Sequence, residues 1–143
     1  MLVRLMYASR ASEQIGAEDL AAILRVSKAN NPATGVTGVL CFCLSSGIFM
    51  QVLEGGRQPV STIYNRIAND ARHREVVLLS YEEIAERSFS GWSMGQVNMS
   101  RLNPSLLLKY SDSAVLDPYA VAGKASLALL NELVATASVS TKA

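Results

Sequence analysis

A short turn between two strand-forming segments is the feature that most constrains how this chain folds. Residues 36–43 and 48–53 are apolar runs, of a kind that favours β-structure. Between them lies Ser45-Ser46-Gly47, and serine and glycine are frequent in tight turns. We therefore predict a β-hairpin at this point of the chain.

The segments on either side of the hairpin supply helices and further strands. Leu20, Ile23 and Leu24 recur at helical spacing within residues 17–29. Asn30-Asn31-Pro32 then ends that helix, because proline disfavours helical geometry in the residue before it. Residues 59–71 show helical spacing as well, while 2–8, 76–84 and 92–97 have the character of strands.

This order of elements, β-α-β-β-α-β followed by a fifth strand, predicts an α+β fold of the ferredoxin-like type. The two helices should cover one face of a largely antiparallel sheet. The space between two parallel helices above a sheet suits a flat ring.

The C-terminal part of the chain differs in character from the predicted sheet region. Residues 103–110 and the Ala- and Leu-rich residues 119–135 could each form a helix. We predict one domain over residues 1–98, a helical extension over 99–137 that packs on the sheet, and a disordered tail over 138–143.

The composition excludes several classes of function. Half of the 143 residues are hydrophobic and 17% are charged, which is typical of a globular protein. The net charge of +1, with basic residues scattered from Arg4 to Lys142, argues against nucleic acid as the partner. The sequence shows neither a secretory signal nor a run long enough to span a membrane. Cys41 and Cys43 are badly placed for a disulfide or a zinc site, so we expect free thiols in the cytoplasm and no metal.

Gln51 is the most informative polar residue, because an amide buried within an apolar strand must find hydrogen-bond partners. Alternation along the strand puts it on the same side as Phe49 and Leu53. That side could face the helices, or it could be the open side of the sheet, and spacing alone leaves both alternatives.

Other polar residues at the edges of the scaffold are also ambiguous. Asn30 and Asn31 could simply end a helix, or the Asn31 amide could offer a donor and an acceptor to the imide edge of a ring. His73 could be a surface residue or a ligand, and no partner for catalysis is evident. Trp92 and Met94 share a face of their strand, where they could be core or site.

Taken together, these segments resemble the BLUF family, the sensors of blue light that use flavin adenine dinucleotide. The resemblance covers residues 5–94 in family order. Its pieces are Leu5-Met6-Tyr7-Ala8-Ser9, Asn30-Asn31 with Gly35-Val36-Thr37-Gly38-Val39-Leu40, Phe49-Met50-Gln51-Val52-Leu53-Glu54-Gly55, Asp70-Ala71-Arg72-His73, Arg87-Ser88-Phe89 and Trp92-Ser93-Met94.

The resemblance implies a role for each matching residue. It makes Tyr7 the electron and proton donor to an excited flavin, and Gln51 the amide that bridges this tyrosine to flavin N5 and O4, on the helix-facing side of the sheet. It makes Trp92 and Met94 the strand-five pair that carries the signal. The residues that it implies for flavin binding are Tyr7, Ile23, Ser27, Lys28, Asn30, Asn31, Phe49, Gln51, Arg66, Ile67, Arg72 and His73.

The resemblance also implies a non-enzymatic photoreceptor that binds flavin without a covalent bond. The expected cofactor is FAD, although FMN or riboflavin could occupy the same site. With about forty residues after the predicted flavin domain, the chain looks like the short class of the family, which contacts separate effector proteins. We further expect a homo-oligomer in the cytoplasm.

Two competing interpretations fit parts of the sequence. Acylphosphatases share the ferredoxin-like fold and use an arginine after the first strand, where Arg10 lies, but their glycine-rich loop is missing around residues 9–14. The other alternative is a flavin-free module that binds a protein through its C-terminal helices.

Overall fold

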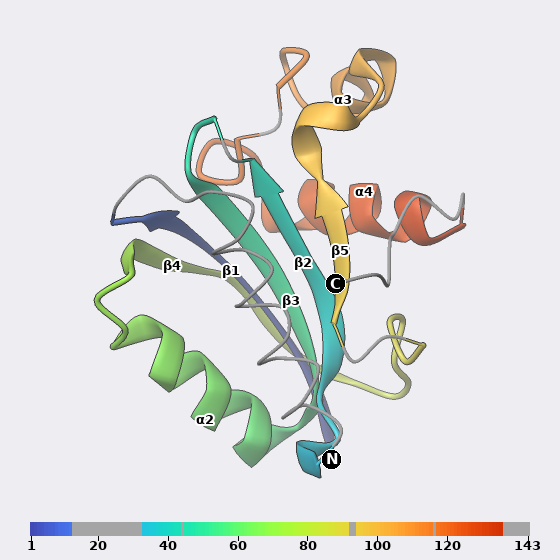
Figure 1. The fold of residues 1–143 in the computed structure, drawn as a ribbon. Helices are drawn as coiled ribbons and strands as arrows, with labels where there is room; N and C mark the ends of the chain where they lie inside the picture. Colours follow the sequence, from blue (N-terminus) through green and yellow to red (C-terminus); the bar gives the residue numbers. More distant parts are fainter. Residues whose placement is uncertain (13–32, 44, 92–93, 116, 136–143) are drawn as a thin grey trace.

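A five-stranded sheet forms the centre of the molecule (Figure 1). The computed structural model describes residues 1–12, 33–43, 45–91, 94–115 and 117–135. The strands are β1 (Leu2–Ala11), β2 (Thr37–Cys43), β3 (Ile48–Gly56), β4 (His73–Ile84) and β5 (Gly95–Asn98), arranged in the order β4-β1-β3-β2-β5. All neighbours are antiparallel except β2 and β5, which run parallel. The predicted α+β ferredoxin-like fold with an added fifth strand is confirmed.

The predicted hairpin joins β2 to β3. Gly47 occupies the turn with φ +70°, a conformation that L side chains rarely adopt, and its N–H donates to the Cys43 carbonyl at 2.9 Å. Gly38 serves close approach instead, since a Cβ there would lie 1.9 Å from the Val52 carbonyl oxygen. Both glycines therefore protect the pairing that sets the register of β3.

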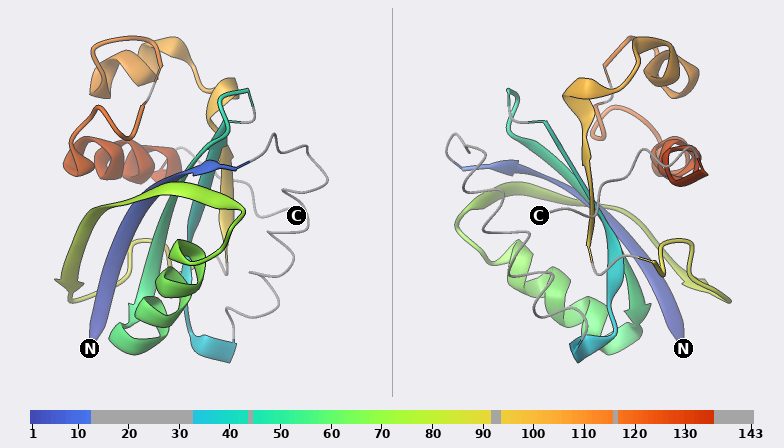
Figure 2. Two further views of the ribbon diagram at one scale, coloured as in Figure 1. Left: turned by 90° about the vertical axis from the view of Figure 1, so that its left-hand side faces the viewer. Right: turned by 45° about the vertical axis from the view of Figure 1, so that its right-hand side comes forward.

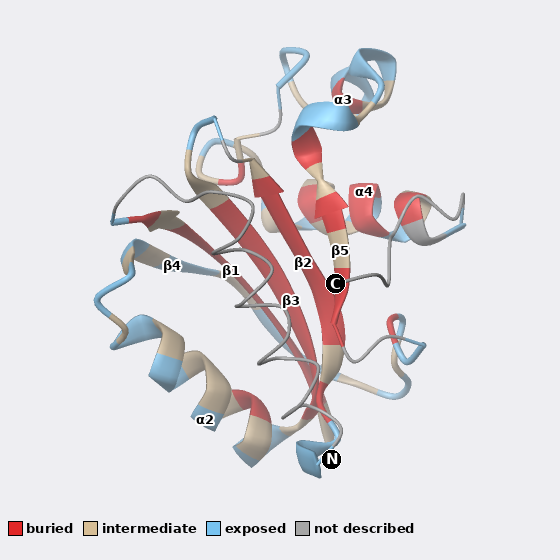
Figure 3. Cartoon of the chain, viewed as in Figure 1, coloured by how far each residue is buried: buried red, intermediate tan, exposed pale blue. Residues whose placement is uncertain are grey.

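The two faces of the sheet carry separate apolar cores (Figures 2 and 3). Helix α2 (Arg57–Ala68) covers one face, where Val60, Ile63, Tyr64 and Ile67 join a core that includes Leu5 and Leu53. The core of the opposite face contains the residues of β1 to β3 that alternate away from α2, namely Met6, Val39, Cys41, Met50 and Val52. We call the face covered by α2 the α2 face, and the opposite face, which is covered by helix α4 (Gly123–Ala135), the α4 face.

The α4 face is covered by the C-terminal elements. Strand β5 leads through the 3₁₀ turn η1 (Met99–Arg101) into α3 (Pro104–Tyr110), and α4 (Gly123–Ala135) follows. Leu129, Leu130 and Leu133 of α4 are 1% exposed and belong to the core of this face. Gly123 lets α4 begin against the sheet, because a Cβ there would lie 2.9 Å from the Leu79 carbonyl oxygen.

Several predicted boundaries differ from those observed. Helix α2 begins at Arg57, not at residue 59, and proline at position 59 is tolerated because the first helical turn needs no partner for its N–H groups. Strand β4 begins at His73, not at residue 76, because His73 pairs with Ala11 of β1. The predicted helix over 17–29 lies outside the described residues. None of the described helices has the length and apolar character required to cross a membrane.

Candidate functional site

Tyr7 and Gln51 form a buried polar pair on the α2 face. They lie directly opposite each other on the antiparallel strands β1 and β3, so the backbone ladder brings their side chains together. The Tyr7 hydroxyl donates to Gln51 Oε1 at 2.5 Å, and the two residues are 1% and 5% exposed. The predicted contact between phenol and amide is confirmed, and Gln51 faces α2, not the opposite side.

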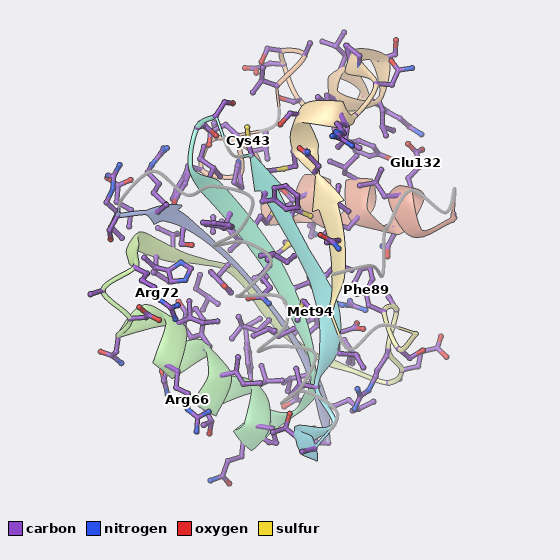
Figure 4. The ribbon with its side chains drawn as sticks, in the orientation of Figure 1. Cys43, Arg66, Arg72, Phe89, Met94 and Glu132 are labelled. Carbon is purple, nitrogen blue, oxygen red and sulfur yellow. The ribbon has the colours of Figure 1, made fainter. Side chains whose placement is uncertain are left out.

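Met94 completes the surroundings of the amide. Gln51 Nε2 donates to the Met94 sulfur at 3.2 Å, across the sheet from β3 to the residue that precedes β5. Met94 is 1% exposed and belongs to the core of the α2 face (Figure 4). Of the predicted signalling pair, Met94 therefore contacts the switch residue, whereas Trp92 lies outside the described residues.

The environment of Tyr7 keeps its phenol neutral. Burial raises the pKa of Tyr7 strongly, and the neighbouring Tyr64 raises it further. The Tyr64 ring of α2 packs against the Tyr7 ring with centroids 5.6 Å apart. Tyr7 therefore enters any reaction as a protonated donor.

His73 lies at the end of the same face. Its Nδ1 is 3.0 Å from the Ser9 hydroxyl, and its ring packs edge-on against Phe49 at 5.8 Å between centroids. Partial burial lowers the pKa of His73; the Asp70 carboxylate opposes this shift and Arg72 adds to it. His73 of β4 thus contacts Phe49, which lies two residues before Gln51 on β3, and the flavin-binding roles of His73 and Phe49 stay predictions.

The two predicted arginines lie at the periphery. Arg66 and Arg72 are exposed, at the end of α2 and in the turn that follows it (Figure 4). Ile67, by contrast, is half-buried against the core. Arg72 Nη2 is 2.6 Å from Asp70 Oδ2. This pairing lowers the pKa of Asp70 to about 2. Both arginines lie at the surface, and their assignment to flavin binding stays a prediction.

The remaining predicted binding residues belong to the segment before β2. Ile23, Ser27, Lys28, Asn30 and Asn31 lie outside the described residues, and their assignments stay predictions.

The chemistry of the described residues fits a flavin ring. Gln51 Nε2 donates to the Met94 sulfur, and an amide nitrogen carries two hydrogens, so the amide has the capacity to donate to a second acceptor as well. A flavin ring offers acceptors at N5 and O4. The Tyr7 phenol, which can be oxidised, lies beside that amide. The amide N–H group and the phenol are donors of the kind that suits such a ring.

Sequence reasoning missed the contacts of four residues, two beside this site and two on the opposite face of the sheet. Tyr64 lies within the predicted helix over 59–71 and contacts Tyr7, and Ser9 lies within the first family motif and contacts His73. Arg4 and Glu54 form a buried ion pair on the α4 face, and the signal available was a charged residue inside each of two apolar strands.

Comparison with known proteins agrees with this geometry. Residues 2–95 match the family described as sensors of blue light using FAD. A photoactivated adenylate cyclase subunit alpha from Euglena gracilis is 38% identical over 88 residues, covering 62% of this chain and 8% of the relative. A subunit beta from Euglena longa is 33% identical over 94 residues, covering 65% and 11%. The chain thus spans about a tenth of the length of these curated relatives.

Two solved structures are similar over nearly the whole chain. The photo-activated state of BlsA superposes with a TM-score of 0.83 at 31% identity, covering 94% of this chain and 95% of that one. The dark-state structure of BlrB, a BLUF protein, gives a TM-score of 0.78 at 29% identity, covering 95% and 96%.

The fold and the tyrosine–glutamine pair define a flavin-dependent light sensor. The chain belongs to the BLUF family of blue-light photoreceptors. The family match assigns residues 2–95 to a sensor and not to an enzyme.

Proposed function

We propose that this chain senses blue light through a hydrogen-bond switch at Gln51 that changes the contact between Gln51 and Met94. The observation that carries the proposal is the continuous chain of contacts from the Tyr7 hydroxyl through the Gln51 amide to the Met94 sulfur. A bound flavin supplies the absorption of blue light and accepts an electron once excited.

Tyr7 acts as the donor in this proposal. It gives up an electron and, from its hydroxyl, a proton to Gln51 Oε1, the atom to which it is already hydrogen-bonded. When the electron and the proton return to Tyr7, the Gln51 side chain is left rotated or tautomerised. The altered amide then donates a different hydrogen bond to the ring edge, and no covalent bond is made.

Rotation has a consequence that follows from the chemistry of Met94. Turning the amide exchanges Oε1 and Nε2, so an oxygen faces the Met94 sulfur in place of an N–H group. A thioether has no hydrogen to donate, so this contact is lost. The start of β5 is then released from β3, and β5 leads directly into η1 and α3.

A single hydrogen bond has a net value of about 1 kcal/mol, so the pocket alone does not drive a large rearrangement. We propose that a modest shift of β5 and the C-terminal helices is read by a separate effector protein or at a subunit interface. Trp92 is proposed to move with Met94. The two free thiols, Cys41 and Cys43, support a cytoplasmic setting.

We propose FAD as the cofactor, with Ile67, Phe49 and His73 beside the ring and Arg66 and Arg72 toward the ribityl phosphate. Ile23, Ser27, Lys28, Asn30 and Asn31 complete the proposed site. Chromatography of the flavin released from purified protein distinguishes FAD from FMN and riboflavin. Light scattering in darkness and under blue light tests whether the chain forms a homo-oligomer.

The decisive measurement is the absorption spectrum of the purified protein before and after blue light, followed through dark recovery. We expect a flavin spectrum that moves reversibly to slightly longer wavelength. Tyr7→Phe should retain flavin and lose this shift, because the donor hydroxyl is gone. A normal shift in Tyr7→Phe removes Tyr7 as the donor, and a colourless wild-type protein favours a flavin-free interaction module.

A further inference from the structure

A buried ion pair on the α4 face, formed by Arg4 and Glu54, contacts residues 88–89, which lie between β4 and β5. Glu54 of β3 is 0% exposed, and its neighbour across the strands, Arg4 of β1, is 8% exposed. Arg4 Nε donates to Glu54 Oε2 at 2.9 Å, and Arg4 Nη1 donates to Glu82 of β4 at 2.7 Å. The pair therefore joins three adjacent strands.

The Glu54 carboxylate also holds the backbone that leads to β5. The N–H groups of Ser88 and Phe89 donate to Glu54 Oε2 and Oε1 at 3.0 and 2.7 Å. The Ser88 hydroxyl accepts from Arg4 Nη2 at 2.7 Å. Hydrogen bonds to an ionised carboxylate are about twice as strong as neutral ones, so these residues are firmly fixed to β3.

Two further contacts fix the same segment. The Phe89 side chain is fully buried in the core of the α4 face. Arg87 Nη1 donates to the Gly35 carbonyl at 2.6 Å and to the Thr37 hydroxyl at 3.0 Å, which ties the segment to the start of β2. Residues 87–89 are thus attached to β3 through Glu54 and to the start of β2 through Arg87.

Met94 lies five residues beyond Phe89, and its sulfur contacts the Gln51 amide on the other face of the sheet (Figure 4). Parallel pairing with β2 sets the register of β5 from Gly95 onward, and the hydrogen bond between the Gln51 amide and the Met94 sulfur is weak by comparison. Gln51 and Glu54 lie three residues apart on β3 and alternate onto opposite faces. One strand therefore carries both the Gln51 amide, which contacts the Met94 sulfur, and the carboxylate that accepts from the Ser88 and Phe89 N–H groups.

We infer that Glu54 is a positioning residue for the photoswitch: it anchors residues 88–89 from the α4 face and so sets the place of the Met94 sulfur against Gln51 on the α2 face. This inference rests on the proposed function. Residues 88–89 act as the fixed end about which the start of β5 moves when the contact between Gln51 and Met94 is lost.

The test compares Glu54→Gln with Glu82→Gln, both in the full chain with flavin bound. Each variant removes one carboxylate charge from Arg4, but only Glu54→Gln disturbs the acceptors of the Ser88 and Phe89 N–H groups. In darkness, Glu54→Gln should move the NMR resonance of the Gln51 side-chain amide and speed hydrogen exchange of β5. Glu82→Gln should leave both unchanged.

Dark recovery provides the second readout. If Glu54→Gln loses the equivalent of about one hydrogen bond that holds residues 88–89, its rate of dark recovery should differ about fivefold from that of Glu82→Gln. An equal position of the Gln51 side-chain amide resonance in darkness and an equal rate of dark recovery in the two variants overturn the inference. If the wild-type protein shows no light-induced shift, the proposed function fails, and the dark NMR comparison still decides whether Glu54 positions Met94.

Wild-type exchange covers the case in which Glu54→Gln does not fold. Under continuous blue light the amides of Ser88 and Phe89 should stay as protected as in darkness, while those of Gly95–Asn98 exchange faster. Loss of protection at Ser88 and Phe89 to the same degree as in β5 contradicts an anchor.

Discussion

The Tyr7 phenol and the Gln51 amide meet because their residues are cross-strand neighbours in a central ladder. Their separation is therefore set by backbone hydrogen bonds and not by the freedom of two long side chains. This placement makes single substitutions informative, since the neighbouring backbone pairs remain when one side chain changes.

Gln51→Leu should keep flavin bound and abolish the light-induced spectral shift, because both atoms that form the switch are removed. It should also lower the free energy of unfolding by about 1–3 kcal/mol, since the Tyr7 hydroxyl is left buried without its acceptor. Spectroscopy under blue light and urea denaturation measure the two effects. The matched control is Gln58→Leu at an exposed position of α2, which should show the normal shift. A normal shift in Gln51→Leu removes the amide from the mechanism.

The raised pKa of Tyr7 gives a prediction about pH. Its phenol stays protonated through the range in which an exposed tyrosine ionises, so the amplitude of the spectral shift should be constant from about pH 6 to about pH 9. The stability contributed by the neutral buried phenol is fully present below the ordinary tyrosine pKa of about 10 and is lost only at more alkaline pH. An amplitude that falls with a midpoint below pH 9 would show that Tyr7 ionises more easily than its burial requires.

At the scale of elements, the sheet separates the switch from the helices that follow it. The core of the α4 face includes Leu129, Leu130 and Leu133 of α4 but no residue of α2, among those described. Strand β5 is the link, since it lies beside β2 in the sheet and continues through η1 into α3. Changes in α4 should therefore affect stability before they affect photochemistry.

Leu130→Ala tests this separation. Leu130 is 1% exposed, so the substitution should cost about 2–5 kcal/mol in the free energy of unfolding, measured with urea. The light-induced spectral shift of the protein that remains folded should be unchanged. Leu108→Ala on α3 is the control, because Leu108 is 54% exposed and its loss should cost little. Abolition of the shift by Leu130→Ala would contradict the expectation that the packing of α4 is not needed for the photochemistry.

At the scale of the whole molecule, the order of elements was predictable because it depends on local patterns. Apolar runs in β2 and β3 and helical spacing in α2 mark these elements without knowledge of their neighbours. The side of the sheet on which Gln51 lies was not predictable from spacing, since alternation places Phe49, Gln51 and Leu53 together but does not say which face is covered. The family resemblance supplied that choice.

Long-range pairing accounts for what the sequence analysis missed. The start of β4 at His73 depends on Ala11, and the anchor at Glu54 depends on Arg4 and on backbone N–H groups at positions 88 and 89. No periodicity reports such contacts, because the partners are many residues apart in the chain. The domain boundaries and the binding residues of segment 13–32 stay predictions.

The alternation of β3 has a consequence for how such a protein can diversify. Gln51 faces one side of the strand, and Met50, Val52 and Glu54 face the other. Substitutions on the second side leave the ladder that spaces Tyr7 from Gln51 intact, whereas inserting a single residue ahead of Gln51 within the strand turns every later side chain over. Point mutations at Met50 and Val52 can therefore change contacts with the α4 face while the Tyr7–Gln51 pair is kept, whereas the insertion of one residue removes that pair.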